Sequence, residues 1–342
     1  MHYFALALIS ALLFGAATPV SKVLLKSLNP FQLAGLLYLG AALAMLPSVV
    51  KRNRKRQSIP LNKRNLSKLT GAVIFGGILG PVLLMLGLSL ASAASVSLWL
   101  NMELVMTAVL GRLIFKDYLG RFGWLGVLGI LLASVLLGIG ERAAGPGAGL
   151  LVVAACICWG IDNHLTALID NFSPAQSTFW KGLVAGTTNL GIGALLSPLA
   201  ISPGIILPAL TVGVFSYGLS ILLYIKSAQH IGATRSQLVF SGAPFFGVLL
   251  AATYFGESLT LLHVISIVLM AVSVSAIFKD RHAHEHQHEK LVHDHSHNHD
   301  DQHHNHTHEM NGSAQSHSHW HEHEPVWHSH PHWPDLHHRH KH

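Results

Sequence analysis

Long apolar segments recur along the first 281 residues of the chain and alternate with short polar connections. A helix that crosses a bilayer needs about 20 mostly apolar residues. Ten segments meet this requirement, and we number them as spans one to ten. We predict that they cover residues 3–22, 31–50, 69–90, 94–115, 121–140, 148–169, 175–197, 204–226, 233–255 and 259–279. The pattern therefore predicts an all-α polytopic membrane protein.

The composition excludes a soluble globular protein. Of the 342 residues, 50% are hydrophobic and only 11% are charged, and the mean hydropathy is +0.43. Soluble domains carry about 25% charged residues, which they need to cover their surface. The first span lacks a positively charged start and is longer than the apolar core of a signal peptide, so we expect it to be retained.

The distribution of Lys and Arg predicts the orientation. The connection 51–68 after span two alone carries eight of them, whereas connections after odd-numbered spans carry only Lys22, Lys26 and Arg142. The positive-inside rule then places both termini in the cytoplasm. We expect a multi-pass protein of the inner or plasma membrane. A basic loop beside an anionic leaflet explains the net charge of +6 without a nucleic-acid partner.

The two halves of the chain resemble each other. Four short matches occur in the same order, pairing Phe14-Gly15 with Trp159-Gly160, 29–32 with 173–176, 93–97 with 232–236, and 115–117 with 255–257. Each half has five spans, and an odd number turns the second copy upside down, as in many secondary transporters. We predict a first five-helix repeat over 1–141, an inverted second repeat over 148–279 and a separate tail over 282–342.

The fourth span of each repeat carries a family resemblance. Residues 97–117, SLWLNMELVMTAVLGRLIFKD, resemble the signature of the EamA family of the drug/metabolite transporter superfamily: a small residue, an apolar run, Glu-Pro, and a helix ending in Gly-Glu or Lys-Glu. Residues 232–257 resemble the second copy, with Pro244 at the proline position. Leu104 replaces the usual proline and Asp117 the usual glutamate of the first copy. The resemblance covers about 3–279 and implies a ten-helix permease of small molecules.

Polar residues inside the spans are the candidates for a substrate pathway. An ionisable group at mid-bilayer costs roughly 2.5–3.5 kcal/mol on insertion scales, so it usually faces the interior of the bundle. Glu103 lies near the middle of span four, four residues before Thr107 and two after Asn101. The alternative is that Glu103 pairs with a neighbouring helix and fixes the packing.

Span six carries Asp162, Asn163 and His164 in succession, and because residues on a helix turn by about 100°, all three cannot face one lumen. In the repeat they align with the segment around Pro19, which we expect to interrupt span one. A proline-interrupted segment opposite a polar one is a pointer to a substrate site. Asp162 is the best candidate of the three to bind a cation or a proton. Lys181 lies nearer a span end, where we expect it to extend to the interface.

Further candidates lie in spans eight and nine, and Pro81 and Pro208 are expected to kink spans three and eight. Such polar residues also serve as helix–helix contacts, so this alternative stays open. The predicted substrate-pathway residues are Asn101, Glu103, Asp162, Asn163, His164, Tyr217, Gln237 and Ser241.

The tail has a different chemistry. Of the 27 histidines, all but His2, His164, His230 and His263 lie in 282–342, and this segment has almost no aliphatic residues, so we predict disorder. Neutral imidazole is a good ligand for zinc, nickel and cobalt. The predicted metal ligands are His284, His286, His288, His293, His295, His297, His299, His304, His306, His308, His317, His319, His321 and His323.

The tail is open to two other interpretations. Residues 284–288 match HExxH formally, but so dense a run of histidines produces such matches by chance, and a zinc protease would need a packed helix and a third ligand. Histidine titrates near pH 6.5, so the tail would also suit a cytoplasmic pH sensor.

We therefore expect a secondary transporter, not an enzyme, that moves a small solute and is linked to a divalent metal through its tail. No nucleotide-binding motif and no required cofactor are predicted. One alternative is a metabolite or amino-acid exporter whose tail only senses metal or pH; another is a membrane-anchored metal-storage protein. The expected partners are the lipid bilayer and a small-molecule or metal-ion cargo, and a homodimer is left open.

Overall fold

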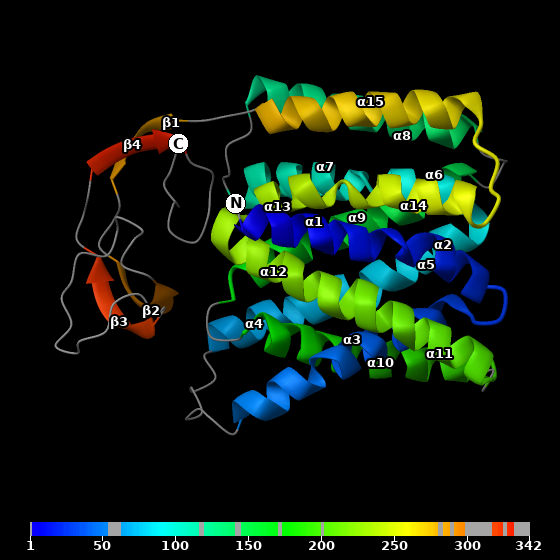
Figure 1. Cartoon of the computed structure of the whole chain (residues 1–342), viewed down its shortest axis with the longest axis horizontal. Coiled ribbons are helices and arrows are strands. Elements are labelled where there is room, and N and C mark those ends of the chain that lie inside the picture. The colour runs from blue at the N-terminus through cyan, green and yellow to red at the C-terminus, as the bar shows by residue number, and fades with distance from the viewer. Residues whose placement is uncertain are drawn as a thin grey trace.

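The computed structural model describes residues 2–53, 63–115, 120–140, 145–169, 173–199, 202–279, 283–287, 291–297, 317–323 and 327–331. Within these residues each of the ten predicted spans coincides with one helical rod (Figure 1). Five of the rods are single helices, namely α3 (Pro30–Asn53), α8 (Arg121–Gly140), α9 (Gly145–Ala167), α10 (Pro174–Leu196) and α15 (Leu261–Lys279). The all-α polytopic fold predicted from the hydrophobic pattern is confirmed.

Seven rods of the described chain are long and apolar enough by themselves to cross a membrane. They are His2–Leu24, Pro30–Lys51, Asn65–Leu90, Ala93–Ile114, Gly145–Ala167, Pro203–Ile231 and Ser236–Thr253. Two more, α8 and α15, carry shorter apolar stretches. Many large apolar side chains point outward from the bundle, as Leu195 does with 90% of its surface exposed. A bilayer accommodates such a surface, whereas water would not.

Three spans are interrupted near their middle. Span one divides into α1 (His2–Gly15) and α2 (Ala17–Leu24), just before Pro19, as predicted. Span four divides into α6 (Ala93–Trp99) and α7 (Met102–Leu110), and the π-helix η2 (Gly111–Phe115) follows; span nine divides into α13 (Ala233–Phe240) and α14 (Ala243–Thr253). Pro244 explains the break in span nine, because proline lacks the N–H that would continue the helix.

Span four breaks at the same place although Leu104 replaces the proline. There the backbone tightens, because Asn101 N, Glu103 N and Leu104 N each bond to the carbonyl three residues back. Asn101 Nδ2 also donates to Leu98 O at 3.3 Å, a local bond that competes with regular helix geometry. The departure from the family pattern therefore leaves the interruption in place.

Spans three and eight each contain a π-helix. Span three runs through α4 (Lys63–Gly71), η1 (Ala72–Leu79) and α5 (Gly80–Leu90), and span eight through α11 (Pro203–Val212), η3 (Gly213–Leu219) and α12 (Ser220–Ile231). Pro81 is the second residue after η1, and the carbonyl of Gly77, four residues earlier, accepts instead from Asn189 Nδ2 at 3.2 Å. Such π-helical insertions occur often at functional sites.

The spans pack according to a two-fold rule. Span one contacts spans eight and nine, and its counterpart, span six, contacts spans three and four. Span two likewise packs on the π-helix of span eight, and its counterpart, span seven, packs on the π-helix of span three. The remaining contacts join counterparts directly, namely spans two and seven, spans four and nine, and spans five and ten. This is the arrangement of two inverted copies around a common axis.

Spans two and seven begin with the same local structure. Asn29 and Gln32 exchange side-chain-to-backbone hydrogen bonds of 2.9 and 3.2 Å ahead of α3, and Ser173 and Gln176 form the same capping box ahead of α10. Pro30 and Pro174 occupy the first turn, where their missing N–H has no helical partner to lose. The sequence match between these segments is thus also a structural one.

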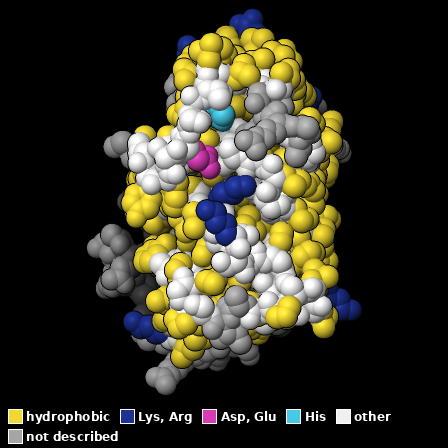
Figure 2. Space-filling model, turned by 90° about the vertical axis from the view of Figure 1, so that its right-hand side faces the viewer, with side chains coloured by type: hydrophobic (Ala, Val, Ile, Leu, Met, Phe, Trp, Pro, Cys, Tyr) yellow, Lys and Arg dark blue, Asp and Glu magenta, His cyan; other side chains and the backbone are white. Residues whose placement is uncertain are grey.

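Helices α2, α5, α6 and α14 each have one terminus at the same end of the bundle (Figure 1). Lys22 Nζ donates to the carbonyls of Leu88 at 2.6 Å and Ala91 at 2.8 Å, which ties α2 to the connection after α5. Charged side chains gather near the centre of this end, with apolar side chains around them (Figure 2). The N-terminus and the tail lie at the opposite end (Figure 1).

In the tail, the structure describes β1 (Ala283–Gln287), β2 (Leu291–His297), β3 (His317–His323) and β4 (Trp327–Pro331). β1 pairs with β4 and β2 with β3, both antiparallel. We predicted disorder here because the segment cannot build a hydrophobic core. The ribbons form without such a core, because hydrogen bonds between the backbones of the paired strands hold them together. Two-stranded ribbons are marginally stable in water by themselves, so the strands do not amount to a folded domain.

Candidate functional site

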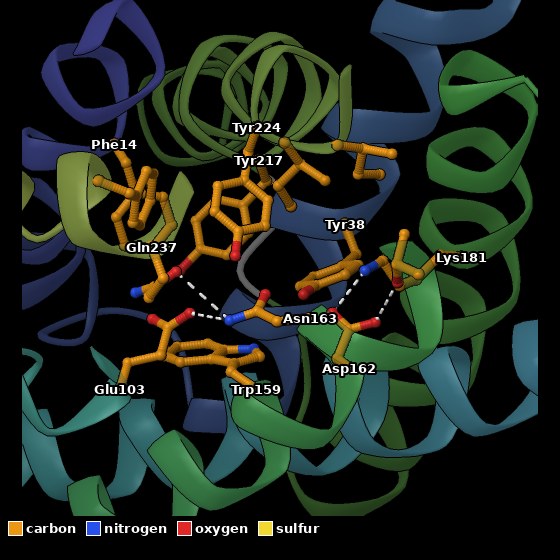
Figure 3. A pocket seen from close by; sticks show the side chains of 14 residues that line it. Phe14, Tyr38, Glu103, Trp159, Asp162, Asn163, Lys181, Tyr217, Tyr224 and Gln237 are labelled. Carbon is orange, nitrogen blue, oxygen red and sulfur yellow. Dashed lines mark hydrogen bonds and ion pairs between the residues drawn. The ribbon is translucent and has the colours of Figure 1, made fainter. Parts of the chain in front are cut away.

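A pocket lies in the middle of the bundle where the two halves meet (Figure 3). The first half contributes Phe14 from α1, Tyr38 from α3 and Glu103 from α7. The second half contributes the remaining walls from α9, α10, η3, α12 and α13. The cavity volume is about 50 Å³, room for about three or four water molecules.

Glu103 is anchored by an amide on the other half. Asn163 Nδ2 lies 2.9 Å from Glu103 Oε1, 3.2 Å from Thr107 Oγ1 and 3.3 Å from Gln237 Oε1. An amide nitrogen has only two protons, so these three acceptors share them. Glu103 also lies in the first turn of α7, where the helix dipole stabilises a negative charge. Among the described residues no basic side chain forms an ion pair with Glu103.

Asp162 is the second carboxylate, and it has a cationic partner. Lys181 Nζ lies 2.6 Å from Asp162 Oδ2, and Thr166 donates to Oδ1 at 2.8 Å. Lys181 is only 3% exposed, so the prediction that it extends to the membrane interface is wrong. The reason is that Asp162, one helix away, compensates its charge inside the bundle. At Gly76 of η1 a Cβ would overlap the Asp162 carboxylate, so glycine leaves the space that the pair occupies.

Aromatic rings form most of the remaining wall. Phe14 packs against Tyr217 and Phe240 with ring centroids 5.4 and 5.3 Å apart, and Tyr38 packs against Tyr217 at 5.4 Å. Trp159 Nε1 donates to Gly76 O at 3.1 Å, and Tyr38 donates to the same carbonyl. The hydroxyl of Tyr217 is buried and has no hydrogen-bond partner in the described structure. It is therefore a polar group that a solute or water can engage.

Five of the eight predicted pathway residues line this pocket, namely Glu103, Asp162, Asn163, Tyr217 and Gln237. The other three are buried beside it. Asn101 lies at the break in span four, His164 Nε2 lies 2.9 Å from Thr107 O, and Ser241 Oγ donates to Leu238 O at 2.6 Å. Their place in a substrate pathway stays a prediction.

Sequence reasoning missed Lys181 and most of the aromatic wall. Apolar aromatic residues in an apolar span carry no signal of their own, because the sequence does not distinguish a ring that faces lipid from one that faces a pocket. One signal was present: Phe14 and Trp159 are repeat counterparts beside a glycine, and both line the pocket.

In the described helical bundle, no three His, Cys, Asp or Glu side chains gather closely enough to hold a metal ion. In the tail, the strand register sets His293 opposite His321, His295 opposite His319 and His297 opposite His317. His288, His299, His304, His306 and His308 lie outside the described residues.

Known proteins resemble this chain over both halves. The model of the EamA-like transporter family matches residues 2–139 and again 147–279. An uncharacterized transporter of Methanothermobacter thermautotrophicus is 29% identical over 290 residues, covering 79% of this chain and 84% of that protein. The uncharacterized transporter YyaM of Bacillus subtilis is 23% identical over 235 residues, covering 63% and 75%. A crystal structure with 13% identity superposes with a TM-score of 0.63 over 82% of this chain and 99% of its own, which supports the fold alone.

Proposed function

This chain belongs to the EamA-like transporter family and is a multi-pass membrane transporter, and we propose that it is a secondary active carrier of a small solute. The observation that carries this proposal is the pocket between the halves, where Glu103 of one repeat meets Asn163 and Gln237 of the other. A solute bound there contacts both copies, so movement of one copy against the other alters its access.

The asymmetry of spans two and seven supports alternating access. Asn29 Nδ2 donates to Gly193 O at 2.9 Å and Ser197 Oγ at 2.8 Å, and Gln32 Nε2 donates to Ser197 O at 2.8 Å. The start of α3 is thereby clamped to the end of α10. The equivalent box of Ser173 and Gln176 bonds only within itself among the described contacts. Within the described part of the chain, one end of the bundle is thus joined by a contact for which the other end shows no equivalent.

We place the unclamped end at the cytoplasm and assign the protein to the inner or plasma membrane. The end of α3 and the start of α4, which flank the basic connection 51–68 with its eight Lys and Arg, lie at that end, as do the N-terminus and the described strands of the tail (Figure 1). Basic loops remain on the cytoplasmic side during insertion. The clamped end, by the same argument, faces outward.

The test is uptake into proteoliposomes that contain the full-length protein and no nucleotide. Radiolabelled nickel, cobalt and zinc are compared with amino acids, with and without an imposed proton gradient. Saturable uptake of at least one solute, above protein-free liposomes, is expected. If no solute moves and the protein only retains metal, the storage alternative replaces the carrier.

We further propose that the tail binds a divalent metal such as zinc, nickel or cobalt. The repeated His-x-His pattern supports this, since imidazole is a favoured ligand of these ions. On the cytoplasmic side, the tail would gather metal for export or regulate transport of another solute.

Deleting 282–342 separates these two roles. If the metal is cargo, the truncated protein should lose metal uptake or lower cellular metal tolerance, whereas a purely regulatory tail leaves solute transport intact but insensitive to metal. Isothermal titration of zinc with the full-length and truncated proteins measures binding directly. Equal zinc binding by both proteins would overturn the assignment of the tail as the metal site. A response to pH without metal would favour the pH-sensor alternative.

A further inference from the structure

The charge of the pocket is unbalanced. It contains two carboxylates, Glu103 and Asp162, and one basic side chain, Lys181, which is already paired with Asp162. Both carboxylates belong to residues that are no more than 7% exposed. A buried charge is costly unless it is compensated, so an ionised Glu103 calls for a positive charge that the described residues do not supply.

The free side of Glu103 faces aromatic rings and polar acceptors. Glu103 Oε1 accepts a hydrogen bond from Asn163 Nδ2. Gln237 Oε1 accepts from the same amide group, and because a carbonyl oxygen has two lone pairs, it can accept a second hydrogen bond. In Figure 3 the Glu103 carboxylate and the Gln237 amide stand together opposite the rings of Tyr217 and Tyr224. Aromatic faces attract a cation that lies within about 6 Å of the ring centroid. The pocket is therefore lined by the oxygens of Glu103 and Gln237 on one side and by aromatic rings on the other.

Other classes of solute fit this space less well. An anion would meet an excess of negative charge, because the Lys181 ammonium is neutralised by Asp162. A zwitterion would need that same lysine for its carboxylate. A hard divalent ion needs six or more oxygen ligands, and carbon rings make up much of this wall.

We propose that the pocket binds a small protonated amine, with its N–H groups donating to Glu103 and Gln237 and its carbon skeleton against the aromatic rings. This inference rests on the proposed carrier function and names its substrate class. The volume of about 50 Å³ restricts the closed pocket to an amine of few atoms. The unpartnered Tyr217 hydroxyl gives such an amine a further polar contact.

The test uses equilibrium binding of radiolabelled ethanolamine to the purified full-length protein, with competition by choline and by ethylene glycol. Ethanolamine should bind saturably and choline about tenfold more weakly, because a quaternary ammonium has no N–H to donate. Ethylene glycol, which has no charge, should not compete. Glu103→Gln should lower ethanolamine affinity by tenfold or more, whereas Glu257→Gln, a carboxylate outside the pocket, should leave it unchanged.

A second variant guards against a folding defect in Glu103→Gln. Gln237→Met should weaken ethanolamine binding while leaving choline binding unchanged, since it removes the amide oxygen that accepts an N–H, which choline lacks. Competition by ethylene glycol equal to that of choline, or unchanged ethanolamine binding by both variants, overturns the proposal. Failure to bind ethanolamine while the proteoliposomes still accumulate an amino acid also overturns it but leaves the carrier function intact.

Discussion

The rings of Phe14 and Trp159 meet edge to face, with their centroids 6.5 Å apart and their planes at 87°. These residues occupy the same position in the two repeats, each followed by a glycine. A Cβ on Gly15 would lie 3.0 Å from Ala243 O of α14, and one on Gly160 would lie 3.1 Å from Thr107 N of α7. Each pair therefore places its ring in the pocket and lets the backbone approach the interrupted span of the other half.

Replacing Trp159 tests this contact. Trp159→Ala removes the ring that packs on Phe14 and the donor to Gly76 O, so we expect a loss of about 3–5 kcal/mol in the free energy of unfolding. Thermal unfolding in detergent, followed by the helical signal, measures the change. Trp180→Ala is the control, because Trp180 is 44% exposed on the outside of the bundle. Equal losses for the two variants would contradict a structural role of the Phe14–Trp159 pair.

The Asp162–Lys181 ion pair predicts strong coupling between two substitutions. Asp162→Asn or Lys181→Met leaves one charge buried without its partner, which costs about 3–5 kcal/mol. The double variant removes both charges and should recover most of that loss. A double-mutant cycle on unfolding free energies gives the coupling. Additive effects of the two substitutions would show that the side chains act independently, contrary to their 2.6 Å contact.

Much of this architecture could be predicted from the sequence, because apolar length defines a span and proline marks a break. The spans, the interruption before Pro19 and several polar pocket residues follow from those two rules. The burial of Lys181 did not follow, since only the fold brings it to Asp162. The break at Asn101 was also hidden, because it depends on a local side-chain bond where the family has proline. Pairings between distant spans are set by packing, which periodicity does not encode.

Glu257 explains why a carboxylate ends the second-copy signature. Its Oε1 and Oε2 accept from the backbone N–H groups of Ala93 at 3.0 Å and Ala94 at 2.9 Å, so it caps α6 of the other repeat. Glu257→Ala should lower the free energy of unfolding by about 0.5–2 kcal/mol. Glu257→Gln, which keeps one acceptor oxygen, should lose less. Thermal unfolding of the purified variants measures both changes, and an identical loss for the two would argue against capping by the oxygen that glutamine keeps.

The clamp between α3 and α10 gives a prediction about transport itself. If the contact of Asn29 with Ser197 opens and closes during each cycle, then fixing it shut should stop turnover without unfolding the protein. Asn29→Cys and Ser197→Cys, joined by a short thiol-specific cross-linker, would fix it. The native thiols of Cys156 and Cys158 are first replaced by alanine, since both are free.

We expect the cross-linked protein to lose nearly all solute uptake into proteoliposomes and to regain it when the cross-link is reversed by reduction. The matched control joins cysteines at Ser173 and Gln176, which lie within one turn of one helix and therefore restrain no movement between spans. Blocking at both positions would point to the reagent, whereas undiminished uptake with a complete Asn29–Ser197 cross-link would mean that this end stays closed throughout transport. The second outcome would make the clamp a fixed joint of the fold and place the moving gate elsewhere in the bundle.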